Sequence, residues 1–230
     1  MGDLPWSHVH FTGVGGVGMG GLAHILADLG ISVSGSDEKS SPMLRTLRIR
    51  DLDVCVGHSA GAVDRADLLV YSNAVPPGNP ERRRAADLGI PTCLRGEFLA
   101  RLAAHFPTVV AVGGSHGKTT TTAMIAHILG TLRMAPGYLV GGSVPGWARS
   151  GGSGERRILV TEVDESDGTQ ALIESTVAVV TNVDDDHSWS VGGIAGLREC
   201  FRQFAAKSEQ IVCWDSDETR DLFGDLPQVK

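Results

Sequence analysis

An α/β fold, in which parallel strands are joined by crossover helices, is the class that the sequence predicts. Short β-rich apolar runs alternate with amphipathic stretches along the 230 residues. Twice, an apolar run is followed by a glycine-rich loop and then by a helical pattern, once near the amino terminus and again near the middle. Because the chain restarts its own pattern, we expect two domains, residues 1–106 and residues 107–230.

The first domain opens with an apolar run at residues 8–12, which predicts the first strand. A glycine loop follows, and then Leu22, Ile25, Leu26 and Leu29 recur at helical spacing until Gly30, which is typical of a helix end. The same reasoning predicts further short strands at residues 31–34, 54–56, 68–71 and 91–94, with helices around residues 43–47 and 81–88.

The second domain opens with another β-branched run, residues 108–112, and a helix is expected at 119–132. After it we expect strands at 158–162 and 176–182, a helix at 194–207 and a strand at 210–214. The glycine-rich stretches at 141–142 and 150–154 predict flexible loops.

Composition excludes several classes of protein. The net charge of −7, from 20 Lys+Arg against 27 Asp+Glu, disfavours a nucleic-acid partner. The longest apolar runs fall far short of the roughly 20 residues that span a bilayer, so no membrane partner is expected. Four scattered cysteines predict neither a zinc site nor a disulfide framework, and without a secretion signal we expect a cytoplasmic protein.

The first glycine loop, residues 13–18, fits the G-x-G-x-x-G pattern between a predicted strand and a predicted helix. Its exposed amides and the helix dipole favour a bound diphosphate. Asp37 follows about 20 residues later, where a dinucleotide-binding domain carries its ribose-binding acid. The loop alone therefore favours NAD, while leaving open which diphosphate ligand binds.

The second glycine loop ends in Gly117-Lys118-Thr119, the core of a phosphate-binding loop. Lysine reaches terminal phosphates, the threonine hydroxyl holds Mg²⁺, and the loop amides surround phosphate oxygens. The general pattern requires glycine where Val112 stands, so the loop is a variant. It predicts nucleoside triphosphate binding and phosphoryl transfer.

Acidic residues follow two predicted strands of the second domain, at residues 162–167 and 184–186. Since ligands of α/β sheets bind at the carboxyl ends of parallel strands, Glu162 is a candidate Mg²⁺ ligand and His187 is a weaker one. The other histidines show no partner constellation in the sequence; we consider His8, His24, His58, His105 and His127 structural.

These motifs together resemble the Mur ligases of peptidoglycan synthesis, along the whole chain. The resemblance is carried by residues 10–19, 34–37, 114–122 and 162–167 and by Thr181-Asn182 with Asp186-His187. It implies a Rossmann-like, parallel-sheet domain that binds a UDP-sugar, followed by a P-loop α/β ATPase domain. The UDP-sugar is implied to contact Gly15, Gly16, Val17, Gly18, Ser36, Asp37 and Ser72.

The resemblance also implies the chemistry, which is ATP-dependent amide formation through an acyl phosphate. Its substrates are UDP-N-acetylmuramate, L-alanine and ATP, with Mg²⁺ as cofactor. Lys118, Asn182 and His187 are implied to be catalytic, and Thr119, Glu162 and His187 to hold Mg²⁺. ATP is implied to bind at Gly114, Ser115, His116, Gly117, Lys118, Thr119 and Thr120.

Members of this family have a longer central domain and a further ligase domain, so we expect the chain to be truncated. Ser188-Trp189 follows His187 where the family has Met or Leu and then Asp, and Ser115 stands where it has Thr. Two alternatives are kept. One is an NAD-dependent oxidoreductase, which has no use for Lys118, and the other is a nucleotide-binding module without catalysis.

Overall fold

The computed structural model describes residues 4–164, 169–184 and 193–227. The chain forms two compact units. Unit 1 comprises Met1–Phe98 and Val140–Ser153, and unit 2 comprises Leu99–Leu139 and Gly154–Lys230. The segment Val140–Ser153 thus belongs to unit 1 although it lies in the second half of the sequence. The domain boundary between residues 106 and 107 stays a prediction.

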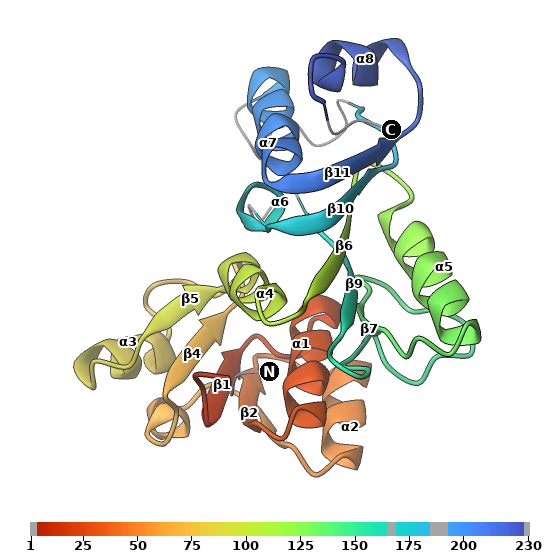
Figure 1. Cartoon of the computed structure of the whole chain (residues 1–230). Coiled ribbons are helices and arrows are strands. Elements are labelled where there is room, and N and C mark those ends of the chain that lie inside the picture. The colour runs from red at the N-terminus through yellow and green to blue at the C-terminus, as the bar shows by residue number, and fades with distance from the viewer. Residues whose placement is uncertain (1–3, 165–168, 185–192, 228–230) are drawn as a thin grey trace. The chain divides into compact units, whose positions relative to one another are not determined.

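Unit 1 contains a five-stranded sheet in the order β3-β2-β1-β4-β5, with every neighbouring pair parallel. Figure 1 shows these strands with the helices that connect them. The elements are β1 (His8–Thr12), α1 (Val17–Asp28), β2 (Ser32–Asp37), α2 (Pro42–Ile49), β3 (Asp53–Val56), the 3-10 helix η1 (Ala60–Val63), β4 (Leu68–Tyr71), α3 (Pro80–Asp87), β5 (Thr92–Leu94) and β8 (Gly151–Gly152). Helix α4 (Arg95–Ala103) begins in unit 1 and ends in unit 2.

Unit 2 contains a sheet with the strand order β11-β10-β6-β9-β7, in which the neighbouring pairs are parallel. Helix α5 lies on one side of these strands and α7 on the other (Figure 1). The elements are β6 (Thr108–Gly113), α5 (Lys118–Thr131), β7 (Gly137–Leu139), β9 (Ile158–Glu162), α6 (Thr169–Leu172), β10 (Ser175–Val180), α7 (Ile194–Ala206), β11 (Ser208–Cys213) and α8 (Asp217–Phe223).

Local sequence explains where two helices of unit 1, α2 and α3, begin. Ser41 caps α2, since its hydroxyl accepts a hydrogen bond from the Leu44 amide at 3.2 Å, and Pro42 occupies the first helical position. Asn79 caps α3 in the same way by accepting from the Glu81 amide at 2.9 Å. Each Ser/Asn-Pro pair therefore both begins a helix and ends the preceding loop.

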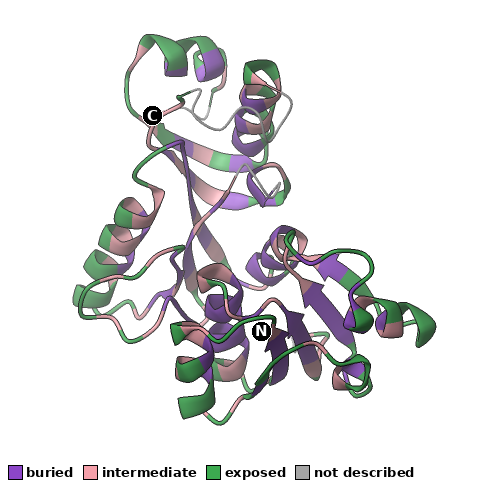
Figure 2. Cartoon of the chain, turned by 180° about the vertical axis from the view of Figure 1, so that it is seen from behind, coloured by how far each residue is buried: buried purple, intermediate pink, exposed green. Residues whose placement is uncertain are grey.

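Buried residues, drawn in purple in Figure 2, make up much of the strands. In unit 1, Phe98 packs edge-on against Phe11 with ring centroids 5.7 Å apart. In unit 2, Phe201 and Phe204 of α7 are fully buried. Strands buried on both faces read as continuous apolar runs, which is why they were predictable as strands.

The expectation of a flexible loop at residues 150–154 is wrong for most of that stretch. Residues 150–153 are buried, and Gly151–Gly152 form β8. A β-carbon at Gly151 would lie 2.2 Å from the carbonyl oxygen of Gly21 in α1, so the glycine permits the close approach of two backbones. Glycine enrichment here reflects tight packing rather than flexibility.

Candidate functional site

The second glycine loop connects β6 to α5 and depends on two glycines. Gly114 has φ +135°, and a β-carbon there would lie 2.0 Å from the Thr181 hydroxyl oxygen. Gly117 is the N-cap of α5 in the left-handed region, with φ +80°. No other residue type adopts both conformations without strain. The loop therefore exposes the amino-terminal end of α5, where the first amides have no acceptor within the helix.

Residues after β10 hold this loop in place. The Asn182 side chain accepts from the His116 amide at 2.8 Å and donates to the His116 carbonyl at 3.2 Å. The Thr181 hydroxyl donates to the same carbonyl at 2.6 Å. Ser115 Oγ donates to the carbonyl of Asp184 at 2.9 Å and accepts from its amide at 2.8 Å. Asn182 thus lies beside the loop and supports its backbone.

Lys118 and Thr119, the first residues of α5, face the loop and the end of β9. Lys118 Nζ donates to the Gly114 carbonyl at 2.6 Å. Thr119 Oγ1 donates to Glu162 Oε2 at 2.8 Å. The sequence-predicted hydroxyl and carboxylate are therefore in direct contact at the amino terminus of α5.

The donor set of Thr119 and Glu162 fits Mg²⁺. This ion prefers oxygen ligands and is usually bound by one or two protein groups together with substrate phosphates and water. Among the described residues, no group of three or more His, Cys, Asp and Glu side chains could hold a metal ion. The third predicted ligand, His187, lies outside the described residues, as do Ser188 and Trp189.

The first glycine loop connects β1 to α1 and is braced by the end of β2. Asp37 Oδ2 accepts from the Gly15 amide at 2.8 Å, and Ser41 Oγ donates to the Gly15 carbonyl at 3.2 Å. A β-carbon at Gly15 would lie 2.7 Å from Asp37 Oδ2, which excludes a larger residue. Gly16 is the N-cap of α1, so the next amides point out of the helix end.

A pocket of about 550 Å³ lies beside this loop, where β1, β2 and β4 end. The predicted residues Gly16, Asp37 and Ser72 line it, together with His58 from the loop after β3. The pocket lies at the carboxyl ends of parallel strands, the usual ligand site of an α/β sheet. Its other lining residues are Gly13, Glu38, Ala74, Val75, Pro76, Gly78, Asn79 and Pro80.

The predicted residue Ser36 lies under this pocket and is fully buried. Its hydroxyl donates to Glu81 Oε2 at 2.7 Å. The same carboxylate oxygen accepts from Thr12 Oγ1 at 2.7 Å and from His10 Nε2 at 3.2 Å, and Oε1 accepts from the Ser59 amide at 3.1 Å. Glu81 is fully buried at the start of α3 and joins three elements of unit 1.

Burial alone would raise the pKa of Glu81. Hydrogen bonds from His10, Ser36 and Thr12 outweigh burial and lower its pKa to about 2. The group is therefore an ionised acceptor at neutral pH. Sequence reasoning missed this network and treated His8 and His58 as isolated, because the network depends on the parallel pairing of β1 with β2 and on contacts of α3 that lie far apart in the sequence.

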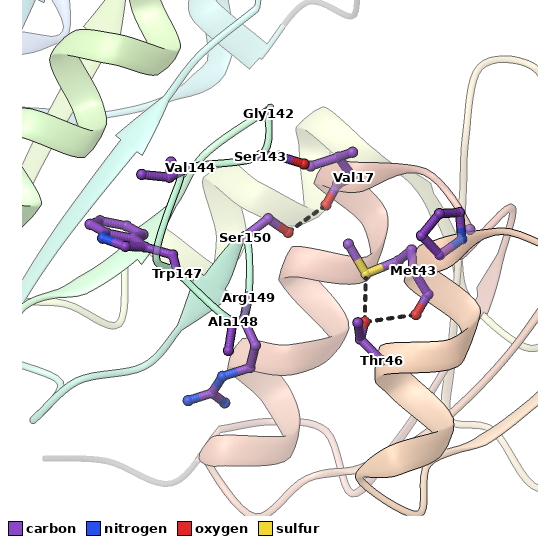
Figure 3. A pocket seen from close by; sticks show the side chains of 12 residues that line it. Val17, Met43, Thr46, Gly142, Ser143, Val144, Trp147, Ala148, Arg149 and Ser150 are labelled. Atoms are coloured by element: carbon purple, nitrogen blue, oxygen red, sulfur yellow. Dashed lines mark hydrogen bonds between the residues drawn. The ribbon is translucent and has the colours of Figure 1, made fainter.

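A smaller pocket of about 240 Å³ lies on the other side of the first loop. Figure 3 shows Val17 and Met43 from the two helices on one side and Trp147 from the segment Val140–Ser153 on the other. Ser150 Oγ donates to the Val17 carbonyl at 3.0 Å. Gly15 and Val17, both predicted to contact the UDP-sugar, line this pocket.

Asp28, at the end of α1, fastens the segment Val140–Ser153. It accepts from Arg149 at 2.9 Å, from Arg50 at 2.6 Å and from the Ser153 amide at 3.2 Å. Burial would raise the pKa of Asp28, but these donors outweigh it and hold the pKa below its ordinary value. The wall of the smaller pocket is thus anchored at both ends of α1.

Family models match both halves of the chain. The model described as the catalytic domain of the Mur ligase family matches residues 8–107, and the one described as the Mur ligase middle domain matches residues 112–225. The oxidoreductase alternative does not explain the match of residues 112–225 to the Mur ligase middle domain. It does not explain the phosphate-binding loop at Lys118 either.

Several curated proteins that match the chain are described as UDP-N-acetylmuramate–L-alanine ligase. The protein of Sorangium cellulosum is 40% identical over 225 residues, which cover 96% of this chain and 48% of the relative. That of Sulfurihydrogenibium sp. is 41% identical over 199 residues, covering 86% and 44%. The chain therefore spans about half the length of the curated relatives it matches.

Solved structures share the fold. The UDP-N-acetylmuramate-alanine ligase of Thermotoga maritima matches with a TM-score of 0.86 at 30% identity, over 94% of this chain and 51% of that one. The UDP-N-acetylmuramate:L-alanyl-gamma-D-glutamyl-meso-diaminopimelate ligase of Neisseria meningitides also reaches 0.86, at 28% identity, over 97% and 77%.

Proposed function

The chain belongs to the Mur ligase family, and from this premise we propose that its parent protein joins L-alanine to UDP-N-acetylmuramate in an ATP-dependent reaction of peptidoglycan synthesis. The observation that carries the proposal is the pair of glycine loops, each at the amino terminus of a helix and each followed by the polar residues its phosphate ligand needs. The relatives described as L-alanine ligases support the choice of acceptor.

The UDP-sugar is proposed to bind at the first loop. Its diphosphate would accept hydrogen bonds from the first amides of α1, after Gly16. The adjoining pocket of about 550 Å³ offers room for the nucleoside, with Asp37 and Ser72 on its wall. In this proposal Ser36 supports the wall of the pocket from beneath through its bond to His58, since the Ser36 side chain is fully buried.

ATP is proposed to bind at residues 114–120. The loop amides would surround the phosphates, and Lys118 would exchange its bond to the Gly114 carbonyl for bonds to phosphate oxygens. Asn182 would keep the loop open, because it holds both backbone groups of His116. Its proposed contribution to catalysis is therefore to position the loop.

Thr119 and Glu162 are the residues that would hold Mg²⁺, with His187 as a third ligand on the strength of the family resemblance. When bound, Mg²⁺ would screen negative charge on the transferred phosphoryl group. The Thr119 hydroxyl could offer an oxygen lone pair to the ion, because its bond to Glu162 uses only the hydroxyl hydrogen.

The proposed reaction has two steps. The lactyl carboxylate of UDP-N-acetylmuramate attacks the γ-phosphorus of ATP, so that an acyl phosphate forms and ADP leaves. The amine of L-alanine then attacks the acyl carbon and phosphate leaves, which forms the amide. Lys118 stabilises charge on the phosphoryl oxygens, and the rest of the site positions the substrates. Because UDP-sugars and ATP are cytoplasmic metabolites, we propose a cytoplasmic location.

Calorimetric titration of the chain with ATP and Mg²⁺ tests the proposal. We expect Lys118→Ala to weaken ATP binding by at least about tenfold, because the charge-assisted bonds of lysine to phosphate are lost. Lys207→Ala, a lysine at the end of α7, is the matched control and should bind as the unmodified chain does. Equal ATP affinity in Lys118→Ala and the unmodified chain would contradict the assignment.

A further inference from the structure

A short chain of hydrogen bonds connects the buried carboxylate of Glu81 to the wall of the larger pocket of unit 1. Glu81 Oε2 lies 2.7 Å from Ser36 Oγ, and Ser36 Oγ lies 2.8 Å from His58 Nδ1. Glu81 and Ser36 are fully buried, whereas His58 lines the pocket and is 19% exposed. The three groups therefore run from the interior of unit 1 to a surface that a ligand can reach.

The direction of each bond follows from the inventory of donors. An ionised carboxylate only accepts, so the bond between Ser36 and Glu81 uses the single hydrogen of the serine hydroxyl. Ser36 can then only accept from His58, and the hydrogen of that second bond must be carried by Nδ1. In the neutral ring, Nε2 is consequently unprotonated and is an acceptor.

The opposite edge of the His58 ring is the one available to a ligand. Nδ1 is bound to Ser36 on the buried side, and nothing in the described part of the chain forms a hydrogen bond with Nε2. The carboxylates of Asp37 and Glu38 line the same pocket. This end of the pocket therefore presents acceptors, which suits ligand groups that donate hydrogen bonds and disfavours phosphate.

We propose that Glu81 is a positioning residue of the nucleotide site. Acting through Ser36, it fixes His58 in the tautomer that carries hydrogen on Nδ1, so that Nε2 accepts a hydrogen bond from the nucleoside of the bound UDP-sugar. The donor is a ribose hydroxyl or the imide N–H of the base, because the phosphates are directed to the amides of the first loop. This inference rests on the UDP-sugar site of the proposed function.

The tautomer is measured on the ligand-free chain by two-dimensional NMR that correlates ring hydrogens with ring nitrogens. We expect the neutral His58 ring to show a protonated Nδ1 and an unprotonated Nε2. Ser36→Ala removes the hydroxyl that accepts from Nδ1–H and leaves the Glu81 carboxylate oxygen 3.7 Å from Nδ1, beyond hydrogen-bond distance, so the ring should change to the Nε2–H form. Ser34→Ala is the matched control: Ser34 also lies on β2 but bonds His8 and His10, so His58 should be unaffected.

A second variant covers the possibility that Ser36→Ala does not fold. In Glu81→Ala the Ser36 hydroxyl is free to donate to Nδ1, so the same change to the Nε2–H form is expected. Finding Nε2–H in the unmodified chain, or Nδ1–H in either folded variant, would overturn the proposal.

Ligand affinity then tests the function of the tautomer. In calorimetry with UDP-N-acetylmuramate, we expect Ser36→Ala to bind about 3- to 10-fold more weakly, the effect of one neutral hydrogen bond, and Ser34→Ala to bind within twofold of the unmodified chain. Equal affinity in the two serine variants would overturn the role given to His58. Absence of UDP-sugar binding by the unmodified chain would instead contradict the proposed function, while leaving the tautomer measurement valid.

Discussion

Two oxygen-bearing side chains from different elements of unit 2, Thr119 and Glu162, lie 2.8 Å apart. Thr119→Val retains the shape of the side chain but removes its oxygen. Because a hydroxyl ligand is lost, we expect the increase in ATP affinity produced by Mg²⁺ to fall by about tenfold, while ATP binding without metal is little changed. Titrations with and without Mg²⁺ measure both quantities.

Thr131→Val provides the comparison for this experiment. Thr131 is exposed at the other end of α5, and its hydroxyl donates to the His127 carbonyl at 2.9 Å. Thr131→Val should retain the full increase in ATP affinity that Mg²⁺ produces. If Thr119→Val also retained it, the assignment of Thr119 as a metal ligand would be wrong.

The buried carboxylate of Glu81 makes stability depend on pH. Its pKa falls from 4.5 in the unfolded chain to about 2 in the folded one, so folding favours the ionised form. The contribution, about 3 kcal/mol, is complete above pH 4.5 and is lost as pH falls towards 2. We expect the free energy of unfolding of the unmodified chain to exceed that of Glu81→Gln at pH 7, with the gap narrowing below pH 4.5.

Urea denaturation of both proteins between pH 3 and pH 7 measures this gap. His24, whose pKa burial and Arg50 lower to about 4, also destabilises the fold as pH falls from 6.5, but it is present in both proteins and cancels. Glu209→Gln, which changes an exposed carboxylate of β11, should show no such narrowing. A gap that stays constant down to pH 3 would contradict the role given to Glu81.

Where a motif is contiguous, the sequence predicts which candidate residues lie close together. Lys118 and Thr119 directly follow the loop at the start of α5, and Glu162 ends β9, a strand whose end an α/β sheet directs to that loop. The network around Glu81 was not predictable in this way, because 69 positions separate Thr12 from Glu81 and 45 separate Ser36 from it. The registered pairing of β1 with β2 puts Thr12 opposite Ser36, and the packing of α3 against these strands brings Glu81 to both.

At the scale of elements, capping residues and apolar periodicity give most helices and strands of the first half. The short elements η1 and β7 were not predicted, because three or four residues carry too little periodicity. Helix α4, which has nine residues, was not predicted either. Strand β2 extends to Asp37, three residues beyond its prediction, since Gly35 and Ser36 pair with Phe11 and Thr12. Glycine and serine have low strand propensity, and tertiary pairing overrides it.

The packing of β8 against α1 gives a prediction about the segment Val140–Ser153. Gly151→Ala would place a β-carbon 2.2 Å from the Gly21 carbonyl oxygen, so one of the two backbones must shift. We expect a loss of about 2 to 4 kcal/mol in the free energy of unfolding, typical of severe overpacking. Chemical denaturation followed by circular dichroism measures it.

Gly130→Ala is the matched substitution for this test. Nothing lies within 4 Å of a β-carbon at Gly130, in the last turn of α5, and alanine favours the helix there. This variant should be unchanged or more stable by up to about 1 kcal/mol. A Gly151→Ala protein as stable as the Gly130→Ala protein would contradict the close approach of β8 and α1.

At the scale of the whole molecule, composition and pattern predicted the fold class. Both sheets have parallel neighbours around a glycine loop, as the alternation of strands and helices indicated. The return of Val140–Ser153 to unit 1 could not be predicted, because it depends on contacts such as Arg149 with Asp28, which are 121 positions apart. Local patterns fix local elements, whereas such long-range contacts require the folded chain.

The central claim is that the first loop takes a UDP-sugar, although its G-x-G-x-x-G pattern and Asp37 are equally typical of NAD sites. Calorimetric titration of the chain with UDP-N-acetylmuramate and, separately, with NAD tests it most directly. We expect saturable binding of UDP-N-acetylmuramate and no heat of binding from NAD. Binding of NAD without binding of the UDP-sugar would contradict the account and reduce the family relationship to a shared fold.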